Sequence, residues 1–358
     1  MKIHNFSAGP CILPQEVFEQ AAAAVLNFNN SGLSILEISH RSKDFVAVME
    51  EARALALELM ELDNNKYTAL FLQGGASLEF LRVPQNFLNK DKTAAYLDTG
   101  TWAIGAAKVA KDFGNIDVIA SSKDTNYSYI PKEYAVPSDA AYLHFTSNNT
   151  IFGTQFKSVP QTKIPLVCDM SSDIFSRKID YSKFDLIYAG AQKNMGPAGV
   201  TLVVIKNSFL ETANTNIPAI LGYKSHASKD SMYNTPPVFA VYTSLLTLQW
   251  LKNNGGIEAI EAKNEAKAEI LYTEIDRNPL FEGVANKEDR SNMNATFVLK
   301  DEAHKETFDA LCKNAGISGL NGHRSVGGYR ASMYNALSIE SVQTLVDQMQ
   351  KLENTITK

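Results

Sequence analysis

Short apolar runs that end in small or polar residues limit the possible folds of this chain more than any other feature. Seven of them lie between residues 67 and 206, including "YTALFLQGG", "IPLVCD", "FDLIYAG" and "VTLVVIK". Because apolar residues follow one another without polar ones between them, these runs are typical of strands buried on both faces. Helical patterns such as "LEFLRVPQNFL" and "AIGAAKVAKDFG" separate several runs. This alternation predicts an α/β fold with a mostly parallel, seven-stranded sheet sandwiched by helices.

The pattern changes after residue 255, where charged helices surround a single clear strand. "IEAIEAKNEAKAEILYTEI" and "SIESVQTLVDQMQKLENTI" have helical spacing, and "NATFVLK" has the composition of a strand. Gly255 and Gly256 stop the preceding helix. We therefore expect an N-terminal arm over residues 1–15, a large domain over 16–255 and a smaller α+β domain over 256–358.

Charge and cysteine usage exclude several classes of protein. The formal net charge is -5 and no dense basic run occurs, which argues against a general nucleic-acid surface. No apolar run approaches the ~20 residues of a membrane span. Cys11, Cys168 and Cys312 are scattered without a CxxC pair, so neither a disulfide framework nor a metal site is expected. With no apolar signal segment at the N-terminus, a cytoplasmic protein is the expectation.

Polar residues directly after the apolar runs are the candidate site. Ligands of an open parallel sheet bind beyond the carboxyl ends of its strands, so residues that follow different strands meet at one edge. The candidates are Gly74 to Ser77, Thr101 and Trp102, Ser147 to Thr150, Asp169, and Gln192 with Lys193.

The segment Gly74-Gly75-Ala76-Ser77 lies between a predicted strand and a predicted helix. Small residues at a helix start let an anion approach free N–H groups. The alternative is a tight strand-to-helix turn without a ligand. The segment is not a Walker A loop, because no Gly-Lys-Ser/Thr follows.

Asp169 and Lys193 follow consecutive apolar runs. Alone, Asp169 could cap a helix, bind a metal or pair with a buried cation, and Lys193 could reach solvent. Together they place a carboxylate and an amine in one cleft, as pyridoxal phosphate enzymes require. Trp102 would then offer an aromatic face to the cofactor ring, although an isolated tryptophan usually belongs to the core.

Arginine is scarce, with eight among 34 basic residues, so its positions are informative. His40-Arg41 and His323-Arg324 are adjacent pairs, and Arg330 follows the second pair closely. Arginine binds carboxylate and phosphate through two hydrogen bonds, and histidine adds a donor. The pairs indicate a ligand with at least two anionic groups; surface salt bridging is the alternative.

The motifs that contain these residues resemble the phosphoserine aminotransferases, a family of class-V, fold-type I pyridoxal phosphate enzymes. They run from residue 6 to 332 and comprise "FSAGPCILP", "SHRSKDF", "GGASLEF", "YAGAQKNMGPAGV", "NTPPVFAVY" and "GHRSVGGYRAS". The resemblance implies a homodimer with active sites at the subunit interface. It also implies reversible transamination in serine biosynthesis, in which phosphoserine and 2-oxoglutarate give 3-phosphohydroxypyruvate and glutamate. Some relatives also act on the phosphorylated threonine precursor of pyridoxine.

The resemblance also implies roles for individual residues. Lys193 matches the lysine that bonds covalently to pyridoxal 5'-phosphate and carries the catalytic proton. The other cofactor contacts that it implies are Asp169 at the pyridine nitrogen, Trp102 on the ring, Thr150 at the phenolic oxygen, Ala76, Ser77 and Gln192 at the phosphate, and Asn234 and Thr235 from the neighbouring subunit. Arg330 matches the clamp for the substrate α-carboxylate. The residues that match the pocket for the distal anion are His40, Arg41, His323 and Arg324.

Two positions differ between branches of the family. One branch has arginine where this chain has Ser77, and some members have serine where it has Ala8. Contacts from those side chains are therefore not implied here.

Two other functions are compatible with parts of the sequence. A related pyridoxal phosphate enzyme, such as a desulfurase or an alanine:glyoxylate aminotransferase, would share Asp169 and Lys193. A non-catalytic binder of phosphorylated metabolites would not need Lys193. The small residues beside that lysine are expected to close around a bound ring. We therefore expect a bulky residue at Gly190 or Gly196 to reduce cofactor occupancy before it unfolds the protein.

Overall fold

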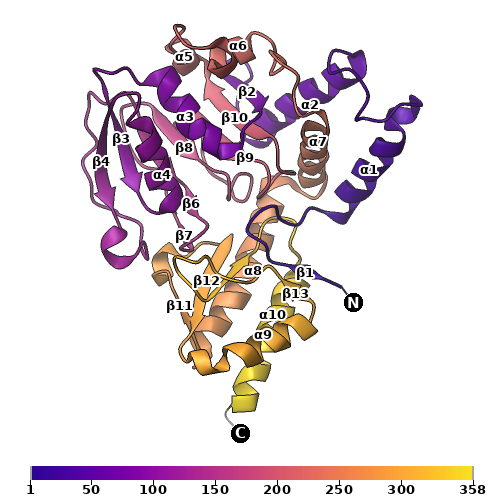
Figure 1. Ribbon diagram of the computed structural model, residues 1–358, viewed down its shortest axis with the longest axis vertical. Helices are drawn as coiled ribbons and strands as arrows, with labels where there is room; N and C mark the ends of the chain where they lie inside the picture. Colours follow the sequence, from indigo (N-terminus) through magenta and orange to yellow (C-terminus); the bar gives the residue numbers. More distant parts are fainter. Residues whose placement is uncertain (1, 357–358) are drawn as a thin grey trace.

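The computed structural model describes residues 2–356 and contains a seven-stranded sheet at the centre of its larger part (Figure 1). Five neighbouring strands are parallel, and β10 is antiparallel to both of its neighbours. This confirms the predicted mostly parallel sheet. In sheet order the strands are β2 (Tyr67–Leu72), β10 (Thr201–Lys206), β9 (Leu186–Gly190), β8 (Leu166–Asp169), β5 (Leu143–Thr146), β3 (Thr93–Asp98) and β4 (Asn115–Ser121).

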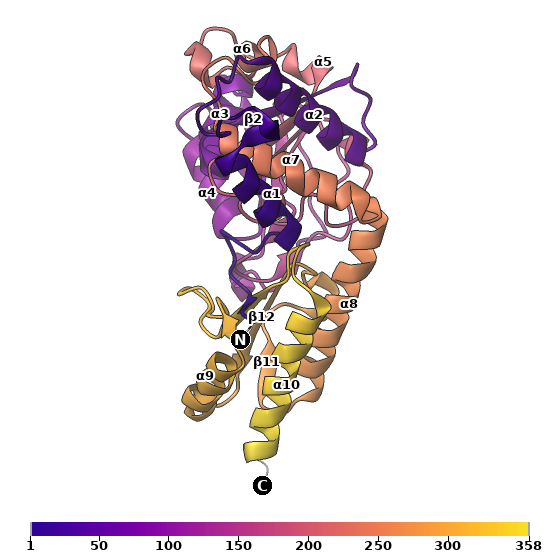
Figure 2. The same cartoon turned by 90° about the vertical axis from the view of Figure 1, so that its right-hand side faces the viewer.

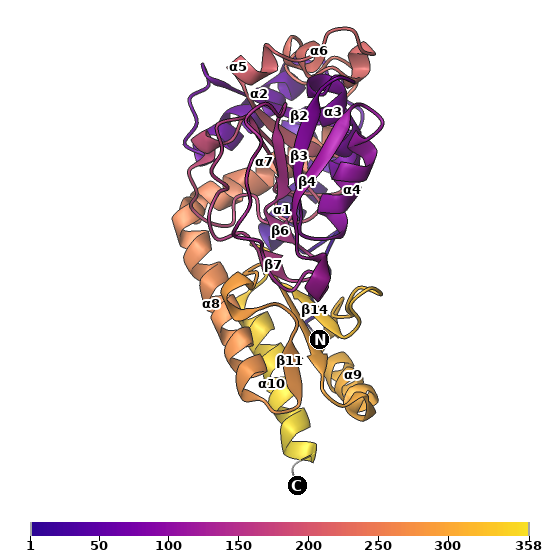
Figure 3. The same ribbon diagram turned by 90° about the vertical axis from the view of Figure 1, so that its left-hand side faces the viewer.

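Helices cover both faces of this sheet (Figures 1 and 3). One face packs on α2 (Lys43–Leu59) and α7 (Val238–Asn253), with α1 (Gln15–Leu26) lying against α7. The other face packs on α3 (Gly75–Phe87) and α4 (Thr101–Ala110), with α5 (Asn207–Leu210) and α6 (Tyr223–Ala227) at one end. In β10, Leu202 faces the first apolar cluster and Val203 the second. Alternate residues of one strand thus enter two cores, which explains its uninterrupted apolar run.

The outer strand β4 is not buried on both faces, although the sequence predicted this for all seven apolar runs. It has a neighbour on one side only, and Val118 is 39% exposed. The prediction was wrong here because its apolar residues lie at the edge of the sheet, where helices cover them incompletely.

A second, antiparallel sheet forms the core of the smaller part of the chain. It contains β11 (Phe281–Gly283), β12 (Asn294–Leu299) and β14 (Tyr329–Ser332). The helices α8 (Gly256–Arg277), α9 (Lys305–Asn314) and α10 (Ile339–Ile356) pack around it (Figure 2). Near the N-terminus, β1 (His4–Asn5) pairs with β13 (Ile317–Ser318), which ties this end of the chain to the smaller part. A short ladder of β6 (Asn148–Asn149) and β7 (Thr154–Gln155) lies between the two larger sheets.

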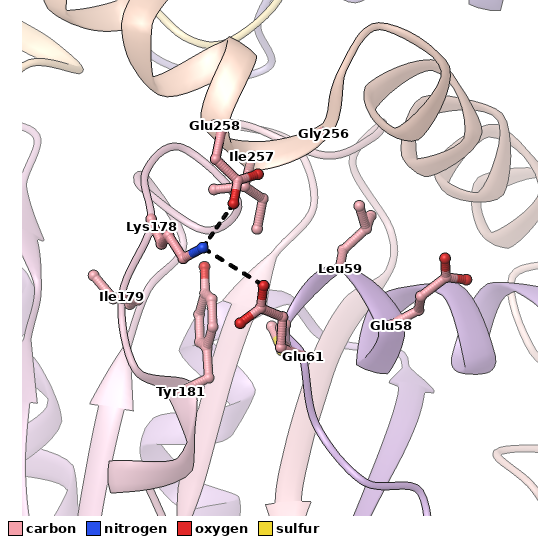
Figure 4. A pocket seen from close by; sticks show the side chains of 10 residues that line it. Glu58, Leu59, Glu61, Lys178, Ile179, Tyr181, Gly256, Ile257 and Glu258 are labelled. Atoms are coloured by element: carbon pink, nitrogen blue, oxygen red, sulfur yellow. Dashed lines mark hydrogen bonds and ion pairs between the residues drawn. The ribbon is translucent and has the colours of Figure 1, made fainter.

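Two kinds of contact join the larger and smaller parts. Near the start of α8, Lys178 Nζ lies 2.8 Å from a carboxylate oxygen of Glu258 and 3.7 Å from one of Glu61, beside a cavity of about 130 Å³ (Figure 4). These side chains are exposed, so the ion pairs contribute little to stability. By contrast, Asn148 Nδ2 donates to Asn294 Oδ1 at 2.7 Å in a wholly buried contact. The domain boundary at residue 255 stays a prediction. Within residues 2–356, every helix is too short or too polar to span a bilayer.

Candidate active site

A cavity of about 370 Å³ lies between the N-terminal segment and the two sheet-containing parts of the chain. It opens beyond the carboxyl ends of the parallel strands, where the sequence predicted a site. Its walls come from seven separate segments. The lining residues are Ala8, Gly9, Gly75, Ala76, Ser77, Phe80, Trp102, Thr150, Ile151, Asp169, Ser171, Gln192, Lys193, His323 and Arg330.

Lys193 lies on the turn that follows β9 and lines this cavity. Its Nζ donates to Thr150 Oγ1 at 3.2 Å and lies 5.4 Å from the centroid of the Trp102 ring. Burial lowers the pKa of Lys193, and the positive charge of Arg330 lowers it further, while Asp169 opposes the shift. A lysine in this setting loses its proton more readily than a surface lysine and can act as a nucleophile or a base.

Asp169 ends β8, and its side chain is buried beside the cavity. Ser171 donates to Asp169 Oδ1 twice, from its hydroxyl at 2.6 Å and from its backbone N–H at 2.9 Å. Gly190 in turn donates its N–H to Ser171 Oγ at 3.1 Å, which directs the serine hydroxyl toward the carboxylate. Burial raises the pKa of Asp169, and the charge of Lys193 and these hydrogen bonds oppose the rise. One carboxylate oxygen is therefore held by the protein, and the other can serve a ligand.

The start of α3 lines the cavity at the segment where the sequence predicted an anion site. Gly74 has φ = 112°, a conformation that favours glycine, and the helix begins at Gly75. The first N–H groups of a helix have no partner within it and attract anions. Ala76, Ser77 and Gln192 line the cavity here. A Cβ on Gly190 would lie 2.8 Å from Gln192 Oε1 and 3.4 Å from the Ala76 nitrogen, so small residues keep this wall open.

Trp102 lies at the start of α4 and forms another wall of the cavity. Its indole Nε1 donates to Thr150 Oγ1 at 3.1 Å. The residue is 37% exposed, so it is not a core tryptophan. Thr150 therefore contacts both the tryptophan and the lysine.

The groups of the cavity fit pyridoxal phosphate. A buried carboxylate suits a protonated ring nitrogen, and an aromatic face suits the flat ring. A helix start with small residues suits the phosphate, and a lysine with a lowered pKa suits the covalent bond. Each of these groups lines the same cavity.

Arg330 and His323 reach the cavity from the smaller part of the chain. Arg330 lies on β14, and its buried Nε has no hydrogen-bond partner within residues 2–356. Burial lowers the pKa of Arg330. A buried guanidinium nitrogen without a partner is costly, so an anionic ligand in the cavity is a natural partner for this half-buried side chain.

Five of the predicted site residues do not line this cavity. His40 and Arg41 lie in the connection between α1 and α2, and Arg324 is exposed beside His323. Asn234 Nδ2 donates to Gln73 Oε1 at 3.1 Å, and Gln73 Nε2 donates to the Thr235 carbonyl at 2.7 Å. Both residues therefore lie outside the cavity of their own chain.

Four lining residues were not predicted: Gly9, Phe80, Ile151 and Ser171. Ser171 had a detectable signal, because a serine two residues after an aspartate commonly donates to that carboxylate. The other three contribute backbone or apolar surface, for which the sequence has no distinctive pattern.

The chain is similar to known proteins in sequence and in structure. A sequence profile of the class-V aminotransferases matches residues 3–345. The phosphoserine aminotransferase of Flavobacterium psychrophilum is 69% identical over 356 residues, which is 99% of this chain and 100% of the relative.

Two solved structures are also similar. The phosphoserine aminotransferase of Bacillus circulans subsp. alkalophilus has a TM-score of 0.96 and 43% identity, covering 99% of both chains. The pyridoxal-phosphate-bound phosphoserine aminotransferase of Trichomonas vaginalis has a TM-score of 0.92 and 37% identity, covering 98% of this chain and 100% of the other.

Proposed function

The chain belongs to the phosphoserine aminotransferases of class V, and from this premise we propose that it interconverts phosphoserine and 2-oxoglutarate with 3-phosphohydroxypyruvate and glutamate in L-serine biosynthesis. One observation carries the proposal. Lys193, Asp169 and Arg330 line a single cavity although they come from separate segments and from both sheet-containing parts of the chain.

The cofactor of this reaction is pyridoxal phosphate, and residues of this chain would hold it. Asp169 would bind the ring nitrogen, Trp102 the ring face, and the start of α3 the phosphate. When bound, the cofactor supplies an aldehyde that bonds to amines and a ring that withdraws electrons from the carbon beside that amine. The fold supplies the orientation.

Lys193 is the group that moves the proton. Because burial lowers the pKa of Nζ, this amine loses its own proton more readily than a surface lysine, and it can then take the proton from the substrate α-carbon and return it. Thr150 Oγ1 accepts from Nζ and holds it in the cavity. Arg330 would bind the substrate α-carboxylate and so place the α-carbon within reach of Nζ. The nearby charge of Arg330 also keeps the pKa of the lysine low.

Most of the residues predicted to bind the distal anion do not line the cavity of their own chain. His323 lines the cavity, but His40, Arg41 and Arg324 do not. We propose a homodimer in which His40, Arg41, Asn234 and Thr235 serve the cavity of the other copy, with Arg324 turning toward the anion when it binds. Exposed apolar side chains near these residues support a surface that a second copy covers. Leu36 is 63% exposed and Tyr233 is 41% exposed.

We also propose the division into an arm (1–15), a large cofactor domain (16–255) and a small domain (256–358). Separate apolar clusters around the two larger sheets support it. The thiols of Cys11, Cys168 and Cys312 are free, which supports a reducing compartment, and we propose the cytoplasm.

A single-turnover experiment tests the proposed function. Phosphoserine should change the visible absorbance of the purified, cofactor-loaded protein, and alanine should not. Arg330→Ala should weaken the half-reactions with phosphoserine and with glutamate by about tenfold or more, because it removes charged hydrogen bonds to the carboxylate that both substrates share. Wild-type kinetics for glutamate in that variant would contradict the assigned role. A faster response to alanine than to phosphoserine would contradict the reaction itself.

A further inference from the structure

His323 lies in a glycine-rich loop whose backbone folds back on it. The N–H groups of Val326 and Gly327 donate to the His323 carbonyl at 2.9 and 2.8 Å. Gly327 and Gly328 both have positive φ, which permits this tight return toward β14. The loop thereby brings the ring of His323 to the cavity wall that also holds Arg330.

Ser325 decides which nitrogen of that ring carries the proton. Its backbone N–H points at His323 Nδ1 at 3.3 Å, and its Oγ lies 2.8 Å from the same atom. A backbone N–H can only donate, so Nδ1 must present a lone pair. The hydroxyl of Ser325 then donates to Nδ1 as well. In a neutral ring the single proton must be on Nε2, the nitrogen on the far side of the ring from Ser325.

The surroundings favour the neutral ring. Partial burial, Arg330 and Arg324 all lower the pKa of His323. No carboxylate within residues 2–356 forms an ion pair with it. Protonation at Nδ1 would also set its hydrogen against the N–H of Ser325.

We propose that Ser325 is a positioning residue that holds His323 as a neutral hydrogen-bond donor, with its Nε2–H available to the distal anionic group of the substrate. This inference rests on the proposed function, because it gives His323 a phosphate or a carboxylate to bind. A neutral donor can serve both groups, whose charges differ, without taking up or releasing a proton. The opposite tautomer would present a lone pair to the anion and repel it.

The protonation state can be measured without substrate. Nitrogen-15 NMR of histidine-labelled holoenzyme at pH 7.5 distinguishes the two neutral tautomers and the charged ring, and loss of one signal in His323→Gln assigns the resonance. We expect His323 to show a proton on Nε2 only. A proton on Nδ1, or a charged ring at this pH, would overturn the proposal.

Kinetics of Ser325→Ala provide the second readout. Removal of the hydroxyl leaves the longer backbone N–H contact, at 3.3 Å, as the remaining Ser325 donor to Nδ1. The Nε2–H tautomer should then be less strongly favoured, and KM for phosphoserine and for glutamate should rise about fivefold, the equivalent of one hydrogen bond, with kcat nearly unchanged. Ser325→Thr keeps a hydroxyl and should restore both the tautomer and KM. Ser318→Ala, at an exposed serine of β13, is the matched control and should change neither.

The two failures are distinguishable. An unchanged tautomer and unchanged KM in Ser325→Ala would overturn the role of Ser325 while phosphoserine turnover persists. Absence of phosphoserine turnover in the wild-type protein would overturn the proposed function, whatever the NMR shows.

Discussion

Gly190 and Gly196 flank Lys193, yet a side chain at each would meet different neighbours. At Gly190 a Cβ would press on Gln192 and on the Ala76 nitrogen, in the wall of the cavity that we propose holds the phosphate. At Gly196 it would collide with Ser244 of α7, in the packed interior. The sequence led us to expect a loss of cofactor occupancy at both glycines. The contacts support that expectation at Gly190 and favour a loss of stability at Gly196 instead.

Gly190→Ala should lower cofactor affinity about tenfold and leave the unfolding free energy nearly unchanged, because the strain falls on the binding wall. Gly196→Ala should lower the unfolding free energy by about 1–3 kcal/mol, the usual cost of overpacking. Cofactor titration followed by absorbance, and urea unfolding of the cofactor-free protein, measure the two effects. Full cofactor affinity in Gly190→Ala would contradict this division.

Ser171 should determine the pH range in which Asp169 can bind a cofactor. Its hydroxyl donates to the carboxylate, and hydrogen bonds of this kind lower a carboxyl pKa. In Ser171→Ala the pKa of Asp169 should rise. When the pH is lowered, the carboxylate of the variant should therefore become protonated, and the cofactor affinity decrease, at a higher pH than in the wild type. Cofactor titrations between pH 5 and 8 test this. Ser171→Thr retains the hydroxyl and should follow the wild-type profile; identical profiles for the alanine variant would disprove the role.

Helix α8 contains a lysine that has no exposed surface and no acidic partner among residues 2–356. Lys267 Nζ donates to the carbonyls of Met333 and Tyr334 at 2.8 and 2.7 Å, where the chain leaves β14. Burial lowers the pKa of Lys267 to about 7, and Lys263 adds to the effect. Lys267 thereby connects α8 to the end of the strand that contains Arg330. Burial of its positive charge lowers the stability of the fold, by an amount that depends on pH.

This cost predicts the pH dependence of stability. Between pH 7 and about 10 the unfolded chain keeps the lysine proton and the folded chain releases it, so the unfolded state binds more protons and stability rises with pH. Below pH 7 both states are protonated and the contribution is constant. Relative to Lys267→Met, the wild-type unfolding free energy should rise between pH 7 and 9 by at most about 1.4 kcal/mol per pH unit. Lys313→Met, at an exposed lysine of α9, should show the wild-type slope in urea titrations. Equal slopes in the wild type and Lys267→Met would contradict a proton-linked cost.

For the molecule as a whole, the sequence predicted mainly those features that follow from the order of strands and helices along the chain. Asp169 and Lys193 meet because parallel strands end at one edge, and this follows from the order of apolar runs alone. The exposure of β4 could not be predicted, because the position of a strand in the sheet depends on pairing between distant segments. The position of Ser171 two residues after Asp169 is a local signal, but the Gly190 N–H that donates to its hydroxyl depends on the folded backbone. The position of His40 and Arg41 outside the cavity depends on tertiary structure in the same way.

The proposed role of His40 and Arg41 in the site of the other copy can be tested by mixing two inactive variants. If Arg41 serves the cavity of the other copy, a chain with Lys193→Ala and a chain with Arg41→Ala should complement each other. Their mixed dimer would contain one cavity with an intact lysine from one chain and an intact arginine from the other. Random exchange would restore activity at about one quarter of all sites, since half of the dimers are mixed and each contains one complete site. Each variant alone should be nearly inactive with phosphoserine.

The experiment mixes the two variants under conditions that allow subunit exchange and measures phosphoserine turnover against the unmixed proteins. A mixture of Lys193→Ala with Arg330→Ala is the matched control. Lys193 and Arg330 line the same cavity of one chain, so each cavity of this mixed dimer lacks one of the two residues. Activity at about one quarter of the sites would return only if Arg330 acted across the interface. We therefore expect no recovery beyond the unmixed proteins in the control. Recovery of activity in the control would contradict the assignment of Arg330 to the site of its own chain. Absence of recovery in the mixture with Arg41→Ala would contradict the assignment of Arg41 to the site of the other copy.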